Sequence, residues 1–462
     1  LSDQTQECVD CHRTVTPGIV EDWLSSEHAS SVPFDSMGKP ELEREVSSPS
    51  IPEDLAAVAV GCFECHGLNP DKHEDNFDHF GYKTNIIVSP ADCATCHEEE
   101  KEQYTQSKKA NALANLNKNP VYHTLVETIT SLKTVQGTSI VQGDSQEFTK
   151  DETCYACHGT PVKFVGTKTV KTELGELDVP VLSRWPNQGV GRTNPDGSRG
   201  ACTSCHPRHS FSIAIARKPE TCSQCHLEPD VPAWNVYRES KHGNYYQAKG
   251  DEWTWDNIPW VLGRDFKAPT CAACHNSLLT DIEGEVVAER SHDFGARLWI
   301  RIFGLIYSHP QPKSGQTYNL KNKDELPLPV TFRGEQASAY LLDRDQQEDR
   351  LERMMNVCGA CHSTSWTGNH FKRFHQTVNE VDKMVWAATE LMLEVWANDL
   401  EEMANPFNET IETSWVEQWL FYANSVRYAA AMMGPDYAAF KNGWWKLTKN
   451  LQDMRDIIRS KR

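Results

Sequence analysis

Residues 201–226 of the chain read ACTSCHPRHSFSIAIARKPETCSQCH and contain the pentapeptide C-x-x-C-H twice, with the first cysteines 20 residues apart. Each copy brings two thiols and one imidazole together over five consecutive residues. The pentapeptide recurs throughout the sequence and includes all 16 cysteines, so that no thiol is left for another purpose. Its eight copies begin at Cys8, Cys62, Cys93, Cys154, Cys202, Cys222, Cys271 and Cys358.

This spacing is typical of the covalent attachment site of c-type haem, in which both thiols form thioethers to the porphyrin and the histidine binds the iron. The sequence therefore predicts eight covalently bound c-type haems as cofactors. The attaching cysteines are Cys8, Cys11, Cys62, Cys65, Cys93, Cys96, Cys154, Cys157, Cys202, Cys205, Cys222, Cys225, Cys271, Cys274, Cys358 and Cys361. The proximal iron ligands are His12, His66, His97, His158, His206, His226, His275 and His362.

Other uses of paired cysteines fit this pattern poorly. A disulfide framework needs no histidine after each second cysteine, and 16 cysteines in 462 residues are too few for a disulfide scaffold. Zinc ribbons join two C-x-x-C pairs without a trailing histidine. Thioredoxin-like redox pairs occur once per βαβ unit and not eight times in one chain. Haem attachment is therefore the interpretation that the motifs favour.

Ten of the 18 histidines remain once the eight proximal ligands are assigned. A low-spin electron-transfer haem takes a second axial base, whereas a catalytic haem keeps one face open for substrate. The segments WLSSEHAS around His28 and YRESKHGN around His242 resemble each other, each with the histidine after an aromatic and a polar turn. We predict seven distal ligands and leave His73, His309 and His375 unassigned. The seven are His28, His79, His123, His209, His242, His292 and His370.

The composition limits the partners that the protein can have. The net charge of −19 argues against nucleic acid or an anionic membrane surface as the main partner. Hydrophobic residues make up only 39%, and no run of about 18 apolar residues is present, so we expect no transmembrane helix. The opening LSDQTQE has no signal-peptide character, which leads us to expect a processed or never exported chain.

The spacing of the motifs varies from 20 to 87 residues and indicates one haem-packed body rather than a solenoid. We expect a mainly α fold with little β structure, whose one convincing strand region is a hairpin over 162–182. Apolar periodicity predicts a long C-terminal helical bundle, with helices over 379–403, 410–433 and 438–460. The expected domains are an octahaem body, 1–370, and a C-terminal helical domain that makes subunit contacts, 371–462.

Haems at this density favour two classes of function. One is an electron conduit in which every iron has two axial ligands from the protein. The other is a multielectron redox enzyme in which one iron keeps an open face and the others store or deliver charge. Asp230, four residues after a proximal histidine, is a candidate proton donor for such chemistry, although an aspartate between two prolines is also a common turn residue.

Several further stretches make the chain resemble the octahaem hydroxylamine oxidoreductase family over almost its whole length. They are RHSFSIAIARKPETCSQCH, ESKHG, IFGLIYSHPQPKSG at 302–315 and AAMMGPDY at 430–437, together with the aromatic-rich helical tail. The resemblance implies a mostly α-helical homotrimer with seven bis-histidine haems. It also implies that the fourth haem, on Cys154, Cys157 and His158, has an open side that carries out nitrogen chemistry.

Members of the family that oxidise hydroxylamine or hydrazine join a tyrosine of the neighbouring subunit's tail to that haem and use an adjacent Asp-His pair for protons. This chain keeps Asp230 but has Val231 in place of the imidazole. In its tail, Trp444 and Trp445 stand where the resemblance leads us to expect the cross-linking tyrosine. We therefore favour reduction of nitrite, to nitric oxide or ammonia, or of hydroxylamine, with Tyr437 near the site but not cross-linked. Oxidation of hydroxylamine or hydrazine remains the alternative.

The resemblance also implies electron exchange with a redox partner, for which a small c-type cytochrome is the expectation. Because covalent haem attachment of this kind takes place outside the cytoplasm, we expect a periplasmic location or an equivalent lumen.

Overall fold

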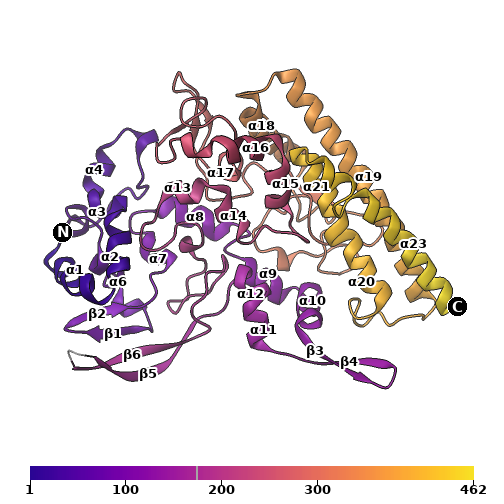
Figure 1. The fold of residues 1–462 in the computed structure, drawn as a ribbon, viewed down its shortest axis with the longest axis horizontal. Coiled ribbons are helices and arrows are strands. Elements are labelled where there is room, and N and C mark those ends of the chain that lie inside the picture. The colour runs from indigo at the N-terminus through magenta and orange to yellow at the C-terminus, as the bar shows by residue number, and fades with distance from the viewer. Residues whose placement is uncertain (173–174) are drawn as a thin grey trace.

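Apolar residues three and four positions apart form the longest helices of the chain, and these lie together at its C-terminal end (Figure 1). The computed structural model describes residues 1–172 and 175–462. Of the described chain, 49% is helical and 13% is in strands, and the sheets are small. The predicted fold class, mainly α with little β structure and a long C-terminal helical bundle, is confirmed.

The helices in the first 360 residues are mostly short and are separated by loops and strands. Many of them carry or flank a C-x-x-C-H motif. In the first part these are α1 Asp3–Val15, α2 Pro17–Leu24, α3 Glu27–Ser30, α4 Pro33–Gly38, α5 Glu53–Ala56, α6 Cys62–His66, α7 Pro90–Cys93, α8 Glu98–Gln106, α9 Ala112–Lys118, α10 Pro120–Thr130, α11 Glu147–Glu152 and α12 Cys154–His158. Then follow α13 Ile213–Arg217, α14 Pro219–Ser223, α15 Ala233–Glu239, α16 Lys241–Lys249, α17 Cys271–His275 and α18 Arg344–Gly359.

The strands form hairpins and short pairings. The predicted hairpin is confirmed, because β5 (Lys163–Thr172) pairs antiparallel with β6 (Gly175–Ser183); the two residues between them, 173–174, lie outside the described chain. Two further hairpins join β1 (Asn76–His79) with β2 (Tyr82–Asn85), and β3 (Ser131–Gln136) with β4 (Ser139–Ser145). The short strands are β7 Trp260–Val261, β8 Leu279–Thr280, β9 Val286–Ala288, β10 Ile300–Arg301 and β11 His309–Pro310.

The C-terminal helices differ from their predicted limits in ways that local chemistry explains. Helix α19 covers Thr364–Ala397 rather than 379–403, because the Ser363 hydroxyl caps its start and Asp399 adopts a positive φ after its end. The predicted helix 410–433 is interrupted, with α20 (Thr410–Val416) and α21 (Ala423–Met432) joined by a π-helical stretch, Glu417–Tyr422. After the break at Gly434, α22 (Pro435–Ala439) and α23 (Trp444–Lys461) complete the chain.

The largest hydrophobic core lies among α19, α20, α21 and α23 and contains fully buried residues such as Val381, Met392 and Trp419. A second core in the middle of the chain is built from aromatic rings, with Trp260 stacked on Phe266 at 3.9 Å between ring centres. In this second core, aromatic rings take the place of much of the aliphatic packing.

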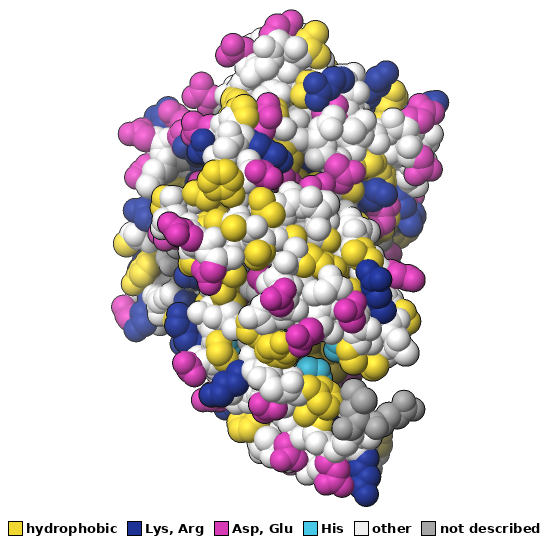
Figure 2. All heavy atoms as spheres, turned by 90° about the vertical axis from the view of Figure 1, so that its left-hand side faces the viewer, with side chains coloured by type: hydrophobic (Ala, Val, Ile, Leu, Met, Phe, Trp, Pro, Cys, Tyr) yellow, Lys and Arg dark blue, Asp and Glu magenta, His cyan; other side chains and the backbone are white. Residues whose placement is uncertain are grey.

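No helix among the described residues is long and apolar enough to cross a membrane. Figure 2 shows the face formed by the N-terminal part of the molecule, where acidic and basic side chains are intermixed and histidine rings reach the surface.

Candidate haem sites and active site

In each C-x-x-C-H motif the histidine comes four residues, about one helical turn, after the first cysteine and directly after the second. In three motifs the pentapeptide is itself a short helix, α6, α12 or α17, and the first motif lies within α1. All 16 cysteines are unpaired and at least partly accessible. The described residues therefore leave each pair of thiols available for thioether bonds.

Imidazole pairs face each other across the spacing that one iron would occupy. Two iron–nitrogen bonds of about 2 Å and about 1.1 Å from each nitrogen to its ring centre place two axial imidazole centres about 6 Å apart. In four pairs, each with one proximal histidine and one predicted distal histidine, the ring centres match this value. The pairs are His12 and His79 at 6.0 Å, His28 and His97 at 6.3 Å, His66 and His209 at 6.5 Å, and His242 and His362 at 6.0 Å.

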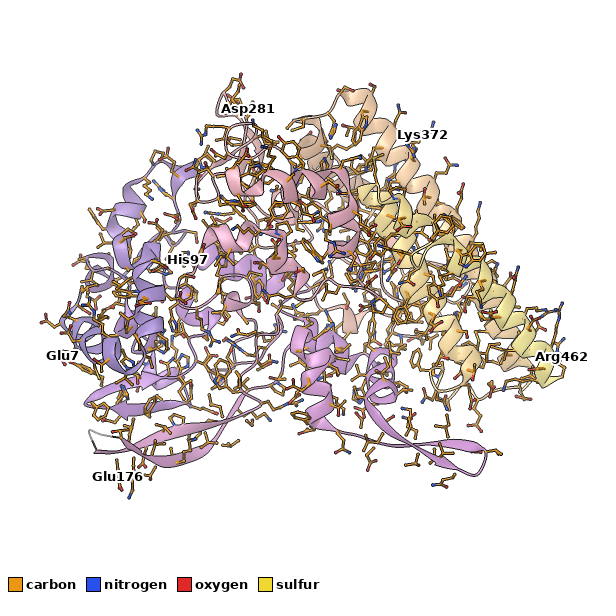
Figure 3. All side chains as sticks on the ribbon, in the orientation of Figure 1. Glu7, His97, Glu176, Asp281, Lys372 and Arg462 are labelled. Atoms are coloured by element: carbon orange, nitrogen blue, oxygen red, sulfur yellow. The ribbon has the colours of Figure 1, made fainter. Side chains whose placement is uncertain are left out.

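The hydrogen bonds of these rings also suit iron ligation. Nδ1 of His66 donates to the Asn85 carbonyl oxygen at 2.7 Å, which leaves Nε2 without a proton and free to bind a metal. Nδ1 of His12 likewise forms a hydrogen bond, with the Thr16 hydroxyl at 2.8 Å, which leaves Nε2 as the nitrogen that faces the iron site. His97, labelled in Figure 3, lies inside the N-terminal half of the molecule. The residues present therefore fit c-type haem.

The other predicted distal ligands have different surroundings. Burial lowers the pKa of His292 to about 4, and the nearby His206 ring lowers it further. His123 is on α10 with Nε2 3.9 Å from the Glu127 carboxylate, and about half of its side chain is exposed. His370 stacks on Trp366, with ring centres 5.3 Å apart.

Contacts between cysteines of different motifs show which attachment sites are neighbours. Cys202 raises the pKa of the Cys93 thiol and Cys222 raises that of the Cys271 thiol, so the two thiols of each pair lie close together. The third motif is thus next to the fifth, and the sixth is next to the seventh. The thiols of the sixth motif, Cys222 and Cys225, in turn raise the pKa of Cys205 in the fifth motif, although burial is the larger cause.

The fourth motif joins this series at the sixth. The Cys157 thiol lies 3.9 Å from the carbonyl oxygen of Gln224, inside the sixth motif, and the nearby Cys225 thiol raises its pKa. Groups bound at neighbouring motifs would be in close contact, so that electrons arriving at the sixth motif have a short route to the fourth.

Three glycines hold the backbone of His158 against a loop. Gly159 has φ +97°, and a Cβ there would lie 2.2 Å from the Arg192 nitrogen. A Cβ on Gly191 would lie 2.7 Å from the His158 carbonyl oxygen, to which the Gly191 N–H donates at 3.2 Å. A Cβ on Gly189 would overlap Gly159. The close approach of these two backbone segments fixes the position of His158.

Charged groups converge on His158 from distant parts of the chain. Burial lowers the pKa of the His158 imidazole, the Asp230 carboxylate raises it, and Arg301 and Lys109 lower it further. The Asp230 side chain is exposed, but protein atoms on its sides desolvate it, and this raises its pKa above the ordinary value of 3.8. The structure thus brings together His158 and Asp230, two of the predicted catalytic residues.

Two residues near this site were not predicted. Tyr428 is buried on α21, and burial raises its pKa, with Asp230 raising it and Arg301 lowering it. Arg301 on β10 pairs in register with His309 on β11, and its Nε donates to the Phe303 carbonyl oxygen at 3.0 Å. Both border segments that carry the family resemblance, 302–315 and 430–437, and this adjacency is the sequence signal that could have located them.

Tyr437, the third predicted catalytic residue, is 2% exposed and packs within its own subunit beside Val236 and Ala429. Its hydroxyl donates to the Glu228 carboxylate at 3.0 Å, and Glu228 precedes Asp230 by two residues. Within one chain, Tyr437 therefore supports the loop that carries Asp230. Trp445, by contrast, is 64% exposed.

Comparisons with known proteins agree with the haem sites. Residues 188–294 match the family model described as "Seven times multi-haem cytochrome CxxCH", and residues 92–178 match "Cytochrome c554 and c-prime". A curated relative, "Probable nitrite reductase-hydroxylamine oxidoreductase fusion protein" of Kuenenia stuttgartiensis, is 32% identical over 338 residues. That alignment covers 65% of this chain and 37% of the relative, so the chain spans little more than a third of that protein.

Among solved structures, a "Hypothetical multiheme protein" is similar over 99% of this chain and 96% of its own, with 42% identity and a TM-score of 0.93. A reducing HAO-like protein complex of Kuenenia stuttgartiensis shares the fold, with 17% identity, a TM-score of 0.62, and coverage of 100% of this chain and 85% of that one. The covalent haem attachment predicted from the pentapeptides is confirmed in its general form by these matches.

Proposed function

Because the chain belongs to the hydroxylamine oxidoreductase family of multihaem c-type cytochromes, we propose that it reduces nitrite, to nitric oxide or ammonia, or reduces hydroxylamine. The observation that carries this proposal is that Asp230 and Arg301 both act electrostatically on His158 and on the buried Tyr428. In this proposal eight haems are bound, and the one on Cys154, Cys157 and His158 has the open face. A haem bound there supplies an iron that takes up the nitrogen compound and passes electrons to it.

Arg301 provides the charge that an anionic substrate needs. Its guanidinium acts on both His158 and Tyr428, which places it within electrostatic reach of the proposed site. A fixed cation in a poorly solvated site attracts nitrite and stabilises negative charge as it develops. We expect Arg301→Gln to raise the KM for nitrite more than that for neutral hydroxylamine.

Asp230 is the proposed proton donor. Removing oxygen from nitrite consumes protons, and an acid whose pKa is raised keeps a larger protonated fraction near neutral pH than an ordinary aspartate. Turnover should therefore fall as the pH rises through the raised pKa of Asp230. Tyr428, with its hydroxyl proton retained by burial, can donate a hydrogen bond beside it.

The test follows reoxidation of the chemically reduced holoprotein by nitrite. We expect rapid, nitrite-dependent loss of the reduced-haem absorbance, and we expect Asp230→Asn to slow it about 100-fold or more and to remove the pH limb. Tyr422→Phe, which removes a hydroxyl that donates to the Glu417 carboxylate at 2.7 Å in the C-terminal helices, serves as the control and should leave the rate close to that of the parent. Failure of nitrite to reoxidise the parent protein contradicts the proposal.

Two other functions would give different results. If the chain oxidised hydroxylamine or hydrazine at a cross-linked haem, a peptide map would show a tyrosine such as Tyr437 attached to porphyrin. A pure electron conduit requires that no haem of the ferric protein is high-spin or binds cyanide. The loss of the imidazole at Val231 and the absence of a tyrosine at Trp444 and Trp445 favour the reductive function over the first of these.

The setting that we propose follows from the cofactor. Haem attachment outside the cytoplasm implies a periplasmic location or an equivalent lumen, and electrons would come from a small c-type cytochrome. We also propose a homotrimer, with residues 1–370 as the haem-binding body and 371–462 as the domain of subunit contacts.

A further inference from the structure

Three turns of the chain share one sequence pattern, an aromatic residue followed by serine at the third position and a possible metal ligand at the fifth. They read WLSSEHA at 23–29, YTQSKKA at 104–110 and YRESKHG at 237–243. In the first and third turns the residue five positions after the aromatic is a histidine, His28 or His242. In the second turn the same position is occupied by Lys109.

The three turns also fold alike. In each, the serine hydroxyl donates to the carbonyl oxygen of the aromatic residue three positions earlier and accepts from the N–H three positions later. The first distance is 2.6 Å for Ser26, 2.6 Å for Ser107 and 2.7 Å for Ser240. The second is 3.3 Å to Ala29, 3.4 Å to Ala110 and 3.1 Å to Gly243. This shared geometry presents the side chain two residues after the serine, His28, Lys109 or His242, in the same way.

Each of the three side chains meets a proximal histidine. His28 faces His97 and His242 faces His362, at the ring separations of axial pairs. Lys109 meets His226, with Nζ 3.4 Å from Nε2. Two axial nitrogens on one iron lie about 4 Å apart, so the amine and the imidazole are separated by nearly the distance that one iron requires.

We propose that the Lys109 amine is the distal ligand of the iron held by His226, so that the haem on Cys222 and Cys225 has a lysine–histidine axial pair. On binding, the ammonium group releases one proton to solvent and its lone pair forms the bond to iron, with no change in oxidation state. This departs from the bis-histidine pair that the family resemblance implies for this haem.

The histidines that lack a partner imidazole have other neighbours in the described chain. His73 is held between Asp75 and Asp92, and His123 lies beside Glu127. His309 donates from Nδ1 to the carbonyl oxygen of Pro310, His370 stacks on Trp366, and His375 lies against Trp299. Among the described residues, the Lys109 amine lies within hydrogen-bonding distance of the His226 ring, with His275 and His158 farther away as electrostatic neighbours.

The position of this haem gives the ligand a consequence for electron flow. The Cys157 thiol lies 3.9 Å from the Gln224 carbonyl oxygen of the sixth motif, so the haem at that motif is the neighbour through which electrons would reach the one held by His158. An amine differs from imidazole as a donor to iron, and axial-ligand identity is one of the main determinants of haem potential. Lys109 would thus set the potential of the step before the proposed active site. This role in turnover rests on the proposed function, whereas the ligation itself does not.

The ferric holoprotein and its variants test the ligation by electron paramagnetic resonance and by cyanide titration. We expect Lys109→Ala to gain about one high-spin haem and one cyanide site per chain relative to the parent, because a six-coordinate iron loses its distal base. Added imidazole or methylamine should restore the low-spin signal. Lys108→Ala, which changes the adjacent lysine, should leave the spin count at the parental value.

Two conservative variants separate ligation from a purely electrostatic role. Lys109→Arg keeps the positive charge, but a guanidinium stays protonated and cannot bind iron, so we expect the same gain of high-spin haem. Lys109→His should remain low-spin and shift the g values of one haem, since it reproduces the residue found in the other two turns. Lys109→His is also the variant that should fold if Lys109→Ala does not.

A parental spectrum in both Lys109→Arg and Lys109→Ala would overturn the proposal, as would a Lys109→His protein whose low-spin signals match those of the parent. These outcomes are differences between variant and parent, so they do not depend on whether nitrite is the substrate. Failure of the proposed function would instead be seen in the parent alone, as absence of nitrite-dependent reoxidation.

Discussion

At the scale of single residues, the glycine contacts beneath His158 are tight enough to predict a local loss of haem geometry. A Cβ on Gly191 would lie 2.6 Å from the Leu113 nitrogen and 2.7 Å from the His158 carbonyl oxygen, both backbone atoms that cannot move aside freely. We expect Gly191→Ala to cost about 1–3 kcal/mol and to disturb the fourth haem selectively. Gly368→Ala on α19, where nothing lies within 4 Å, is the control. Equal high-spin signals in the two variants would contradict the prediction.

His73 predicts a dependence of stability on pH. Burial opposes its charged form, but the hydrogen bond to Asp92 and the Asp75 carboxylate 3.4 Å from Nδ1 outweigh burial and raise its pKa from 6.5 to about 10. Because the folded pKa is raised, the stabilisation is complete below about pH 6.5 and is lost as the pH rises through about 10. We expect the unfolding free energy of the parent to fall by up to about 1.4 kcal/mol per pH unit relative to His73→Gln. Denaturant titrations followed by circular dichroism measure this, and parallel profiles would count against it.

The residues of the candidate site illustrate what a sequence alone can locate. His158 and its cysteines are predictable because thioether attachment and ligation are encoded in five consecutive residues. Arg301 and Tyr428 are not, since they reach the site from β10 and α21, and nothing local marks them as neighbours of Asp230. Lys109 is not predicted as a ligand for a different reason, because a lysine in a polar turn is in most proteins a solvated surface residue.

At the scale of elements, α21 is tied to α19 by a buried ion pair that predicts a large effect on stability. The guanidinium of Arg427 is fully buried, pairs with Asp382 on α19 and donates to the Ile302 carbonyl oxygen at 3.1 Å. We expect Arg427→Met to cost about 3–5 kcal/mol, because it leaves Asp382 without its partner. Thermal or denaturant unfolding measures the change.

The matched control for Arg427 lies on α23. Arg459 forms an ion pair with Asp456 at 3.1 Å, but both side chains are more than 70% exposed. Arg459→Met should therefore change the unfolding free energy by less than about 1 kcal/mol. Similar losses for the two variants would mean that the buried pair does not hold α21 against α19.

Elements were predictable where hydrophobic periodicity is strong. Helix α19 and the hairpin of β5 and β6 follow from that pattern, whereas β3 and β4 have almost entirely exposed residues and so lack the alternation that marks a half-buried strand. The π-helical stretch between α20 and α21, EQWLFY, has a composition that an α-helix would also accept, so the sequence does not mark it.

At the scale of the whole molecule, exposed apolar residues beside the last helix break predict where subunits meet. Phe440 is 71% exposed, Trp445 is 64% exposed and Met433 is 48% exposed, and all three flank the segment of Tyr437. Burial of such side chains in a subunit interface is favourable by about 1.5–3 kcal/mol each. We expect the parent to sediment with the mass of about three chains and Phe440→Ser with Trp445→Ser to shift it towards one. Phe34→Ser, on α4 at the opposite end of the chain and 69% exposed, should leave the mass unchanged (Figure 1). A parent that sediments as a single chain would overturn this assignment, and an unchanged trimer in the double variant would place the interface elsewhere.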